Sequence, residues 1–218
     1  FNLLKSEDVK STLKCLKKLG VKVKQYKNSC EITGKGLNGF KYSKKITLNA
    51  GNSGTLGRLL LGLLVHSKNK IIIKGDKSLS KRDFLRVTKP LQKFGATFNS
   101  NSGGRLPLTV MGTNLPRPIQ YFESRGSAQC KSSIMLAAIN TKGETKIKAK
   151  KSRNHTELLF KYLKIPIKIQ KKKNYDLINI KGRKSIKPFN YNIPSDISSS
   201  AFFIVLAALG EKSKIKIK

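Results

Sequence analysis

The 218-residue sequence predicts a mixed α/β fold of the α+β type, built from repeated β-α-β-α-β-β units that pack around a common axis. Two patterns support this: a helix followed by two strands, and a Ser-rich turn that opens an apolar helix and is followed by one strand. Each pattern occurs three times, with a period of about 70 to 78 residues. An ordinary doubly wound parallel sheet is the alternative, and it fits less well because each strand pair lacks an intervening helix.

The first pattern begins with an amphipathic helix. Its apolar positions in the three copies are Val9, Leu13 and Leu16, then Phe84, Val87, Leu91 and Phe94, then Leu158, Leu159, Tyr162 and Leu163. Gly20 and Gly95 follow the first two helices as left-handed caps, and Pro90 predicts a kink or a restart of the second. The strand pairs that follow are VKVKQY with SCEITG, ATF with LPLTVMG, and IPIKI with DLINIKG.

The second pattern supplies the more apolar helices. They are expected over Ser53 to Val65, Ser127 to Ile139 and Ser198 to Leu209, and the strands KIIIKG, ETKIKAK and SKIKIK follow them. We expect these helices to lie centrally beneath short sheets, because that arrangement buries them. Two complete units and parts of two more are visible. Two prolines in KPFNYNIPSD predict a domain boundary near Phe189 to Pro194.

The start of the first apolar helix is a candidate anion site. In NAGNSGTLGRLL, three glycines surround small polar residues just before the helix: Gly51, Gly54 and Gly57 around Asn52, Ser53 and Thr55. Such a turn lets backbone N–H groups face a ligand, and the helix dipole favours negative charge. Arg58, one turn into the helix, can add a charge-assisted contact. The alternative is a capped core helix whose glycines serve packing alone.

The next apolar helix opens in the same way. SAQCKSS offers Ser127, Gln129 and Lys131 as donors, so two equivalent helix starts suggest two anionic groups. Arg82 in GDKSLSKR and Arg153 in SRNHTE stand at equivalent positions of their units and supply further cations. Either arginine alone is commonly a surface residue.

Composition limits the remaining function classes. The formal charge of +35 is compatible with nucleic-acid binding, but lysines scattered through every segment without interleaved aromatic residues indicate a solvated surface, so no nucleic-acid partner is expected. No stretch approaches the roughly 20 apolar residues of a membrane span, and we expect a cytoplasmic protein. Cys15, Cys30 and Cys130 form no CxxC pair, and His66 and His155 lack a second ligand at metal-binding spacing, so no metal is expected.

Six motifs, in order, resemble the 5-enolpyruvylshikimate-3-phosphate (EPSP) synthase family: NAGNSGTLGRLL, GDKSLSKR, LPLTVMG, SAQCKSS, SRNHTE and PSDISSSAFF. The resemblance implies an enolpyruvyl transferase-like fold with two domains of three units each, of which the chain covers roughly the N-terminal half. Residues 1–190 would form the first domain, incomplete at its N-terminus, and residues 191–218 would begin the second. The implied reaction transfers the enolpyruvyl group of phosphoenolpyruvate to the 5-hydroxyl of shikimate 3-phosphate, with no cofactor, in a monomer.

The resemblance also implies the ligand contacts. Those to phosphoenolpyruvate are Asn52, Gly54, Thr55, Arg82 and Gln129, and those to shikimate 3-phosphate are Ser127, Ala128, Gln129, Ser152 and Arg153. The chain departs from the family pattern at Leu56, Asp83 and Asn154, none of which should remove a contact. No catalytic residue is assigned within these residues, because the family's acid and base belong to the other half.

Two other functions remain open. The sister enzyme that transfers enolpyruvate to UDP-N-acetylglucosamine in cell-wall synthesis shares the fold and the chemistry. A basic RNA-handling protein of the RNA 3′-phosphate cyclase type uses related repeat units, and it would show strong, salt-sensitive RNA binding.

Overall fold

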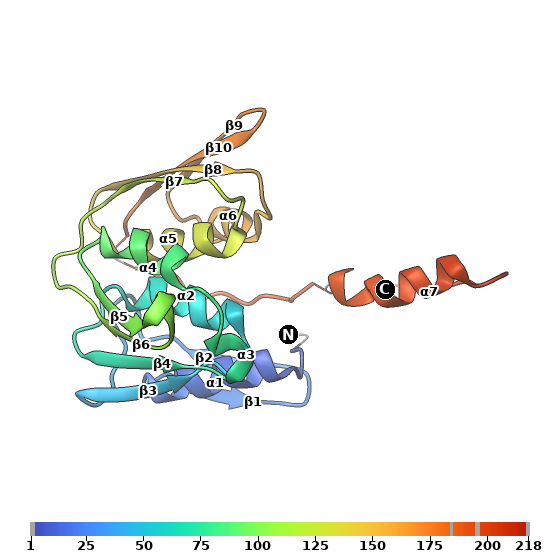
Figure 1. Ribbon diagram of the computed structural model, residues 1–218, viewed down its shortest axis with the longest axis horizontal. Helices are drawn as coiled ribbons and strands as arrows, with labels where there is room; N and C mark the ends of the chain where they lie inside the picture. The colour runs from blue at the N-terminus through green and yellow to red at the C-terminus, as the bar shows by residue number, and fades with distance from the viewer. Residues whose placement is uncertain (1–2, 184, 195–196, 217–218) are drawn as a thin grey trace.

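Two four-stranded sheets with the same strand order form the outer layers of the protein, and helices fill the space between them (Figure 1). The computed structural model describes residues 3–183, 185–194 and 197–216. One sheet has the order β3-β4-β6-β5 and the other β7-β8-β10-β9. Their strands are β3 (Lys45–Asn49), β4 (Lys70–Lys74), β5 (Thr97–Asn101), β6 (Arg105–Met111), β7 (Gln120–Glu123), β8 (Glu144–Lys150), β9 (Ile167–Lys171) and β10 (Tyr175–Lys181).

Each sheet mixes parallel and antiparallel pairs. The first two strands of a unit, β3 with β4 or β7 with β8, are parallel, because a helix connects them. The remaining pairs are antiparallel. Short connections join β5 to β6 and β9 to β10, whereas the outer helices and an edge strand lie between β4 and β6 and between β8 and β10. The sequence prediction of two complete β-α-β-α-β-β units is therefore confirmed, and a doubly wound parallel sheet is excluded.

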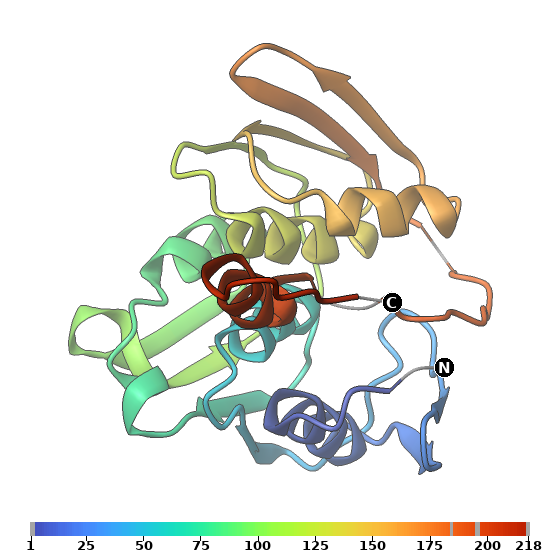
Figure 2. The ribbon, with the colours of Figure 1, turned by 90° about the vertical axis from the view of Figure 1, so that its right-hand side faces the viewer.

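The two apolar helices α2 (Gly54–Leu64) and α5 (Ala128–Ile139) pack against each other in the middle layer. Both are apolar on most faces, which suits helices that are covered on all sides. Gly62 permits the close approach: a Cβ added there would lie 2.9 Å from the carbonyl carbon of Ser133 and closer still to its oxygen. Figure 2 shows α5 beneath the β7–β10 sheet, beside α6 (His155–Tyr162).

A partial unit precedes these two. Helix α1 (Glu7–Lys18) leads into a two-stranded hairpin of β1 (Lys22–Gln25) and β2 (Cys30–Thr33). The Ser6 side chain accepts a hydrogen bond from the backbone N–H of Val9 and caps the helix. Gly20 follows α1 with a φ of +81°, which confirms the predicted left-handed cap.

The outer helices of the two complete units differ in how they end. Short α3 (Lys77–Ser80) precedes α4 (Leu85–Gln92), and a 3-10 turn (Ser102–Gly104) joins β5 to β6. Gly95 caps α4 at a φ of +106°, whereas Lys164 takes the equivalent left-handed position after α6. Pro90 lies within α4, and the helix runs through it, so the expected restart does not occur.

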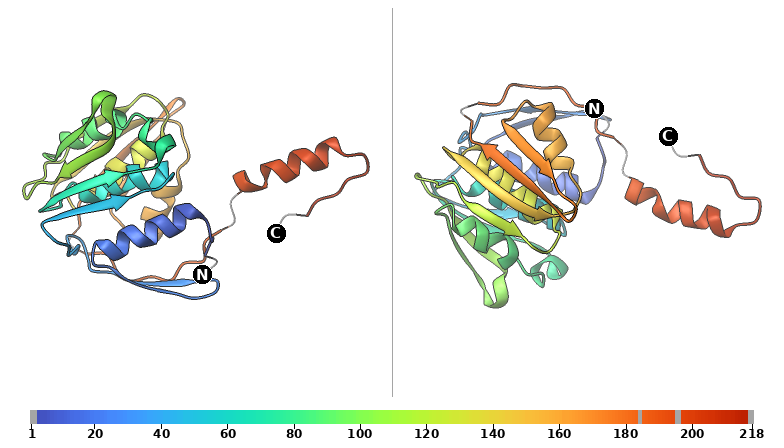
Figure 3. Two further views of the ribbon diagram at one scale, coloured as in Figure 1. Left: turned by 60° about the horizontal axis from the view of Figure 1, so that its bottom comes forward. Right: turned by 90° about the horizontal axis from the view of Figure 1, so that it is seen from above.

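The last helix, α7 (Ile197–Leu209), projects away from the two-sheet body (Figures 1 and 3). Its apolar side chains are consequently exposed: Phe202 by 78%, Leu206 by 66% and Leu209 by 79%. Residues 213–216 form no strand, which corrects the prediction for SKIKIK as far as the described residues reach. Among the described residues, no helix is both long enough and apolar enough to cross a membrane.

Candidate anion-binding site

The first turn of α2 presents backbone N–H groups that the helix itself cannot use. Ser53 is the N-cap, and its side-chain oxygen accepts from the N–H of Leu56 at 3.2 Å. The N–H groups of Gly54 and Thr55 stand ahead of the first intrahelical hydrogen bond and have no partner within the helix. They give the positive end of the helix dipole two free donors.

The first turn of α5 repeats this arrangement. Ser127 caps it by accepting from the N–H of Cys130 at 3.3 Å, which leaves the N–H groups of Ala128 and Gln129 without partners within the helix. The buried carboxylate of Glu123 accepts from the N–H of Ser127 at 2.9 Å and from that of Arg125 at 3.2 Å. Glu123, at the end of β7, therefore holds the turn that leads into α5.

Two side-chain hydrogen bonds join the two helix starts. The Gln129 amide nitrogen donates to the Thr55 hydroxyl at 2.9 Å, and Arg58 donates to the Gln129 amide oxygen at 2.6 Å. Arg58 is 3% exposed, and its guanidinium lies 5.3 Å from the centre of the Phe84 ring, at cation–π distance. The orientation of the Gln129 amide is therefore fixed by α2.

Positive charge accumulates at this junction. Burial, and then repulsion from Arg86 and Arg82, lowers the pKa of Arg58. The guanidinium nevertheless stays charged, because its ordinary pKa is so high. Since no carboxylate pairs with Arg58 among the described residues, a bound anion would relieve the repulsion.

Gly54 lies directly beside two guanidinium groups. A Cβ at this position would be 3.1 Å from an Nη of Arg58 and 3.1 Å from an Nη of Arg82. The Arg82 side chain is exposed and forms no hydrogen bond with the described residues. Its guanidinium is thus available to a ligand that lies against the first turn of α2.

The loop that carries Arg82 is tied to the turn before α2. Asp76 caps α3 by accepting from the N–H of Leu79 at 2.7 Å, and it also accepts from the Asn52 amide at 2.5 Å. These hydrogen bonds, that of Leu79 first, lower the pKa of Asp76. Asn52 thus donates its amide to Asp76 in this structure, and this hydrogen bond fixes the relative position of the two loops.

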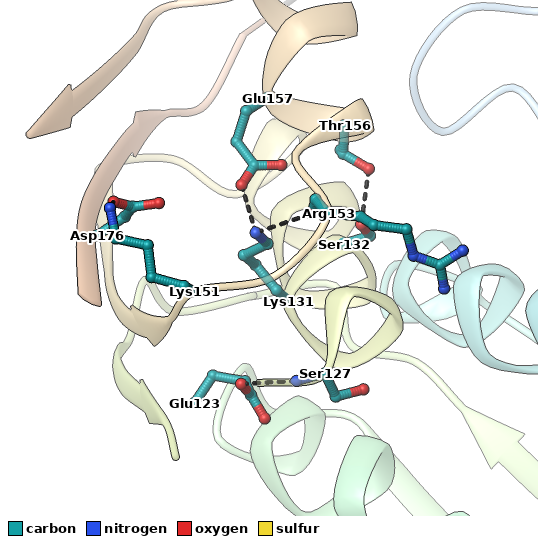
Figure 4. A network of polar contacts seen from close by, with 9 residues as sticks. All are labelled: Glu123, Ser127, Lys131, Ser132, Lys151, Arg153, Thr156, Glu157 and Asp176. Atoms are coloured by element: carbon teal, nitrogen blue, oxygen red, sulfur yellow. Dashed lines mark hydrogen bonds and ion pairs between the residues drawn. The ribbon is translucent and has the colours of Figure 1, made fainter. Parts of the chain in front are cut away.

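The loop between β8 and α6 carries Ser152 and Arg153. The Arg153 side chain is exposed and extends away from Lys131 (Figure 4), and it forms no hydrogen bond with the described residues. The Ser152 hydroxyl is enclosed and has no hydrogen-bond partner there. Both side chains therefore have unused hydrogen-bonding capacity.

Lys131 does not play the part that the sequence suggested. It was expected to donate to an anion at the α5 start, but it is 1% exposed and its ammonium pairs with Glu157 at 2.5 Å. The first-turn position puts the side chain on the buried side of α5, toward α6. Lys131 is consequently unable to reach a ligand at the helix start.

The predicted residues form two groups, one at α2 and one that runs from α5 to the β8–α6 loop, and the hydrogen bond between Gln129 and Thr55 joins them. Sequence reasoning missed three supporting groups: Glu123, the contact between Arg58 and Gln129, and the Lys131–Glu157 pair.

Of the departures from the family pattern, Asp83 accepts from the N–H of Leu85 at 2.6 Å. Among the described residues, no cluster of three His, Cys, Asp or Glu side chains could hold a metal ion.

Repeated β-α-β-α-β-β units with two capped helix starts side by side define an α/β protein of the enolpyruvyl transferase type. The chain belongs to the EPSP synthase family, whose model, EPSP synthase (3-phosphoshikimate 1-carboxyvinyltransferase), matches residues 1–218.

Individual relatives agree with the family model. The chain is 37% identical over 219 residues to a 3-phosphoshikimate 1-carboxyvinyltransferase of Bacillus cytotoxicus, covering 100% of the chain and 50% of that protein. It is 42% identical over 216 residues to the same-named protein of Ruthia magnifica, covering 98% of the chain and 48% of the relative. The solved EPSP synthase from Acinetobacter baumannii superposes with a TM-score of 0.84 at 37% identity, over 96% of this chain and 47% of that one. The chain therefore spans about half the length of the relatives it matches.

Proposed function

We propose that this chain supplies one half of the active site of an enzyme that transfers the enolpyruvyl group of phosphoenolpyruvate to the 5-hydroxyl of shikimate 3-phosphate. The observation that carries the proposal is the bridged pair of helix starts, in which Gln129 contacts Thr55 while Arg82 lies beside Gly54. Both substrates carry phosphate, and such helix starts bind anions. The relatives' names support the choice of substrates.

In this proposal phosphoenolpyruvate lies against the first turn of α2. The N–H groups of Gly54 and Thr55 and the Arg82 guanidinium would bind its anionic groups, with Asn52 holding the turn through Asp76 and Gln129 facing it from α5. Charge-assisted hydrogen bonds to preorganised donors are strong and need no rearrangement when the ligand arrives.

Shikimate 3-phosphate would lie against α5 and the β8–α6 loop. The first turn of α5, with Ser127, Ala128 and Gln129, offers its donors, and Ser152 and Arg153 would bind the phosphate. Because Gln129 contacts Thr55, the two substrates would meet where α2 and α5 touch. Holding two reactants in contact in this way removes much of the entropic barrier to their reaction.

The chemistry then requires a proton donor and acceptor that these residues do not include. The 5-hydroxyl oxygen adds to C2 of phosphoenolpyruvate, its proton is removed and a proton is added at C3. Phosphate then leaves C2 as a proton is lost from C3, which restores the C2–C3 double bond and gives the enol ether product. The described residues would orient and neutralise the substrates, and a second domain would supply the acid and base.

We propose the domain division at residues 190 and 191 for the same protein. Helix α7 holds the place in its repeat unit that α2 and α5 hold in theirs, yet its apolar side chains face solvent beyond the two-sheet body. This suits a helix that belongs to the core of a second domain. We expect the complete protein to be a monomer and to need no cofactor.

The test is phosphate release from phosphoenolpyruvate by this chain extended to the length of its relatives, with shikimate 3-phosphate and UDP-N-acetylglucosamine offered in parallel. Release only with shikimate 3-phosphate supports the proposal, and release only with the sugar would assign the protein to the sister reaction. If neither acceptor leads to phosphate release, and the protein retards RNA in a gel in a salt-sensitive way, an RNA-handling role would be supported. The 218-residue chain alone should show no turnover.

A further inference from the structure

We infer that the buried Lys131–Glu157 ion pair is a positioning device for the Arg153 loop, which it holds so that the Arg153 guanidinium faces the phosphate of the second substrate. The inference rests on the proposed function and adds residues to which that function assigns no role. Neither Lys131 nor Glu157 would touch the substrate.

The geometry places one ammonium group between two elements. The Lys131 ammonium, on α5, contacts a Glu157 carboxylate oxygen at 2.5 Å and donates to the backbone oxygen of Arg153 at 3.1 Å (Figure 4). The carbonyl of Arg153 therefore points inward to Lys131 while its side chain extends outward. Fixing the carbonyl orients the stretch of backbone from which the Arg153 side chain extends.

The loop has little else to hold it at this point. Asn154 occupies the N-cap position of α6, but its side chain makes no capping hydrogen bond. Two residues before Arg153, the exposed Lys151 ammonium pairs with Asp176 at 3.5 Å, a distance and exposure at which an ion pair contributes little. The bond from Lys131 thus does the anchoring that a side-chain cap commonly does at a helix start.

Burial makes the pair costly to keep for stability alone. The Lys131 side chain is 1% exposed and that of Glu157 is 4% exposed, and the second Glu157 oxygen has no hydrogen-bond partner among the described residues. Apolar residues of similar size at two such positions commonly give equal or greater stability. A role in orienting the loop accounts for charged residues here.

The same two helices share a second contact that provides a matched control. The hydroxyls of Ser132 and Thr156 lie 2.6 Å apart, next in sequence to Lys131 and Glu157. Among the described residues, neither hydroxyl forms a hydrogen bond with Arg153. Removing this contact weakens the α5–α6 interface without freeing the Arg153 carbonyl.

The experiment measures binding of shikimate 3-phosphate and of unphosphorylated shikimate by calorimetry, to this chain extended to the length of its relatives. Lys131→Met/Glu157→Met removes both charges at nearly constant length. We expect it to keep the wild-type melting temperature, to bind shikimate 3-phosphate about tenfold more weakly, and to bind shikimate within about twofold of wild type. Ser132→Ala/Thr156→Val should bind both ligands within about twofold of wild type.

Two further arms keep the inference refutable. An Arg153→Ala variant has already lost the phosphate contact. Replacing Lys131 and Glu157 in that variant should therefore cause no additional loss of affinity for shikimate 3-phosphate. If the Met pair does not fold, Lys131→Gln/Glu157→Gln serves instead, because glutamine is one bond shorter and loses the Arg153 carbonyl. A folded variant of either kind that binds shikimate 3-phosphate as wild type does would overturn the inference. Failure of the wild-type chain to bind that ligand would instead overturn the proposed function, and the positioning role with it.

Discussion

Replacing Gly62 by alanine should separate the two central helices. The added Cβ would lie 2.9 Å from the carbonyl carbon of Ser133, with the carbonyl oxygen nearer still, and this obstacle is backbone that cannot rotate away. Restoring ordinary contact requires α2 and α5 to move apart by about 1 Å, and such overpacking typically costs about 1 to 3 kcal/mol or more. Alanine returns about 1 kcal/mol through its better helix propensity. Because the obstacle is backbone, the cost should lie at the upper end of that range, about 3 kcal/mol, and the net loss should be about 2 kcal/mol. That is a substantial part of the roughly 5 to 15 kcal/mol of a typical domain.

Urea unfolding followed by circular dichroism measures this loss as a lower midpoint with an unchanged slope. Gly34→Ala is the control, because a Cβ there meets nothing within 4 Å and the free energy of unfolding should change by less than about 0.5 kcal/mol. A Gly62→Ala midpoint equal to that of wild type would refute the claim that backbone approach at this glycine sets the distance between the helices.

Three further changes probe the site. Gly54→Ala places a Cβ 3.1 Å from the guanidinium groups of Arg58 and Arg82, so calorimetry with the extended chain should show phosphoenolpyruvate binding weakened about tenfold, while the urea midpoint stays unchanged. Arg58→Met frees the Gln129 amide, and the KM for phosphoenolpyruvate should rise by about tenfold or more. Because hydrogen bonds lower the pKa of Asp76, its carboxylate stabilises the fold at neutral pH. The melting-temperature difference from Asp76→Asn should therefore shrink as the pH falls below 3.8.

The repeat could be predicted because its helices and strands show the regular spacing of apolar residues within short segments of the sequence. Residues such as Leu13, Val87 and Leu91 are buried where helical spacing placed them, and the period-2 strands lie beside them in sheets. The start of each apolar helix could be predicted for the same reason. The side chains of Ser53 and Ser127 each accept a hydrogen bond from the backbone N–H three residues later in the same segment. Where a structural feature depends on neighbours within one turn, the sequence alone identifies it.

The supporting contacts of the site were not predictable in the same way. Arg58 and Gln129 are 71 residues apart, and no spacing rule connects them. Lys131 stands in the first turn of its helix, where a lysine that reaches a ligand and one that turns inward have the same local sequence. Only the packing of α6 against α5, with Glu157 facing it, decides between the two.

The last helix and the residues after it show the same division between local and long-range information. Helix α7 forms although it touches neither sheet, because the hydrogen bonds of a helix lie within its own segment. The alternating residues 213–216 form no strand, whereas the similar ETKIKAK segment is β8, paired on one side with β7 and on the other with β10. A strand needs a neighbouring strand to satisfy its backbone, so an alternating pattern predicts one only where the fold supplies a partner. The repeat therefore encodes its helices locally, and its strands depend on the sheet that the rest of the unit builds.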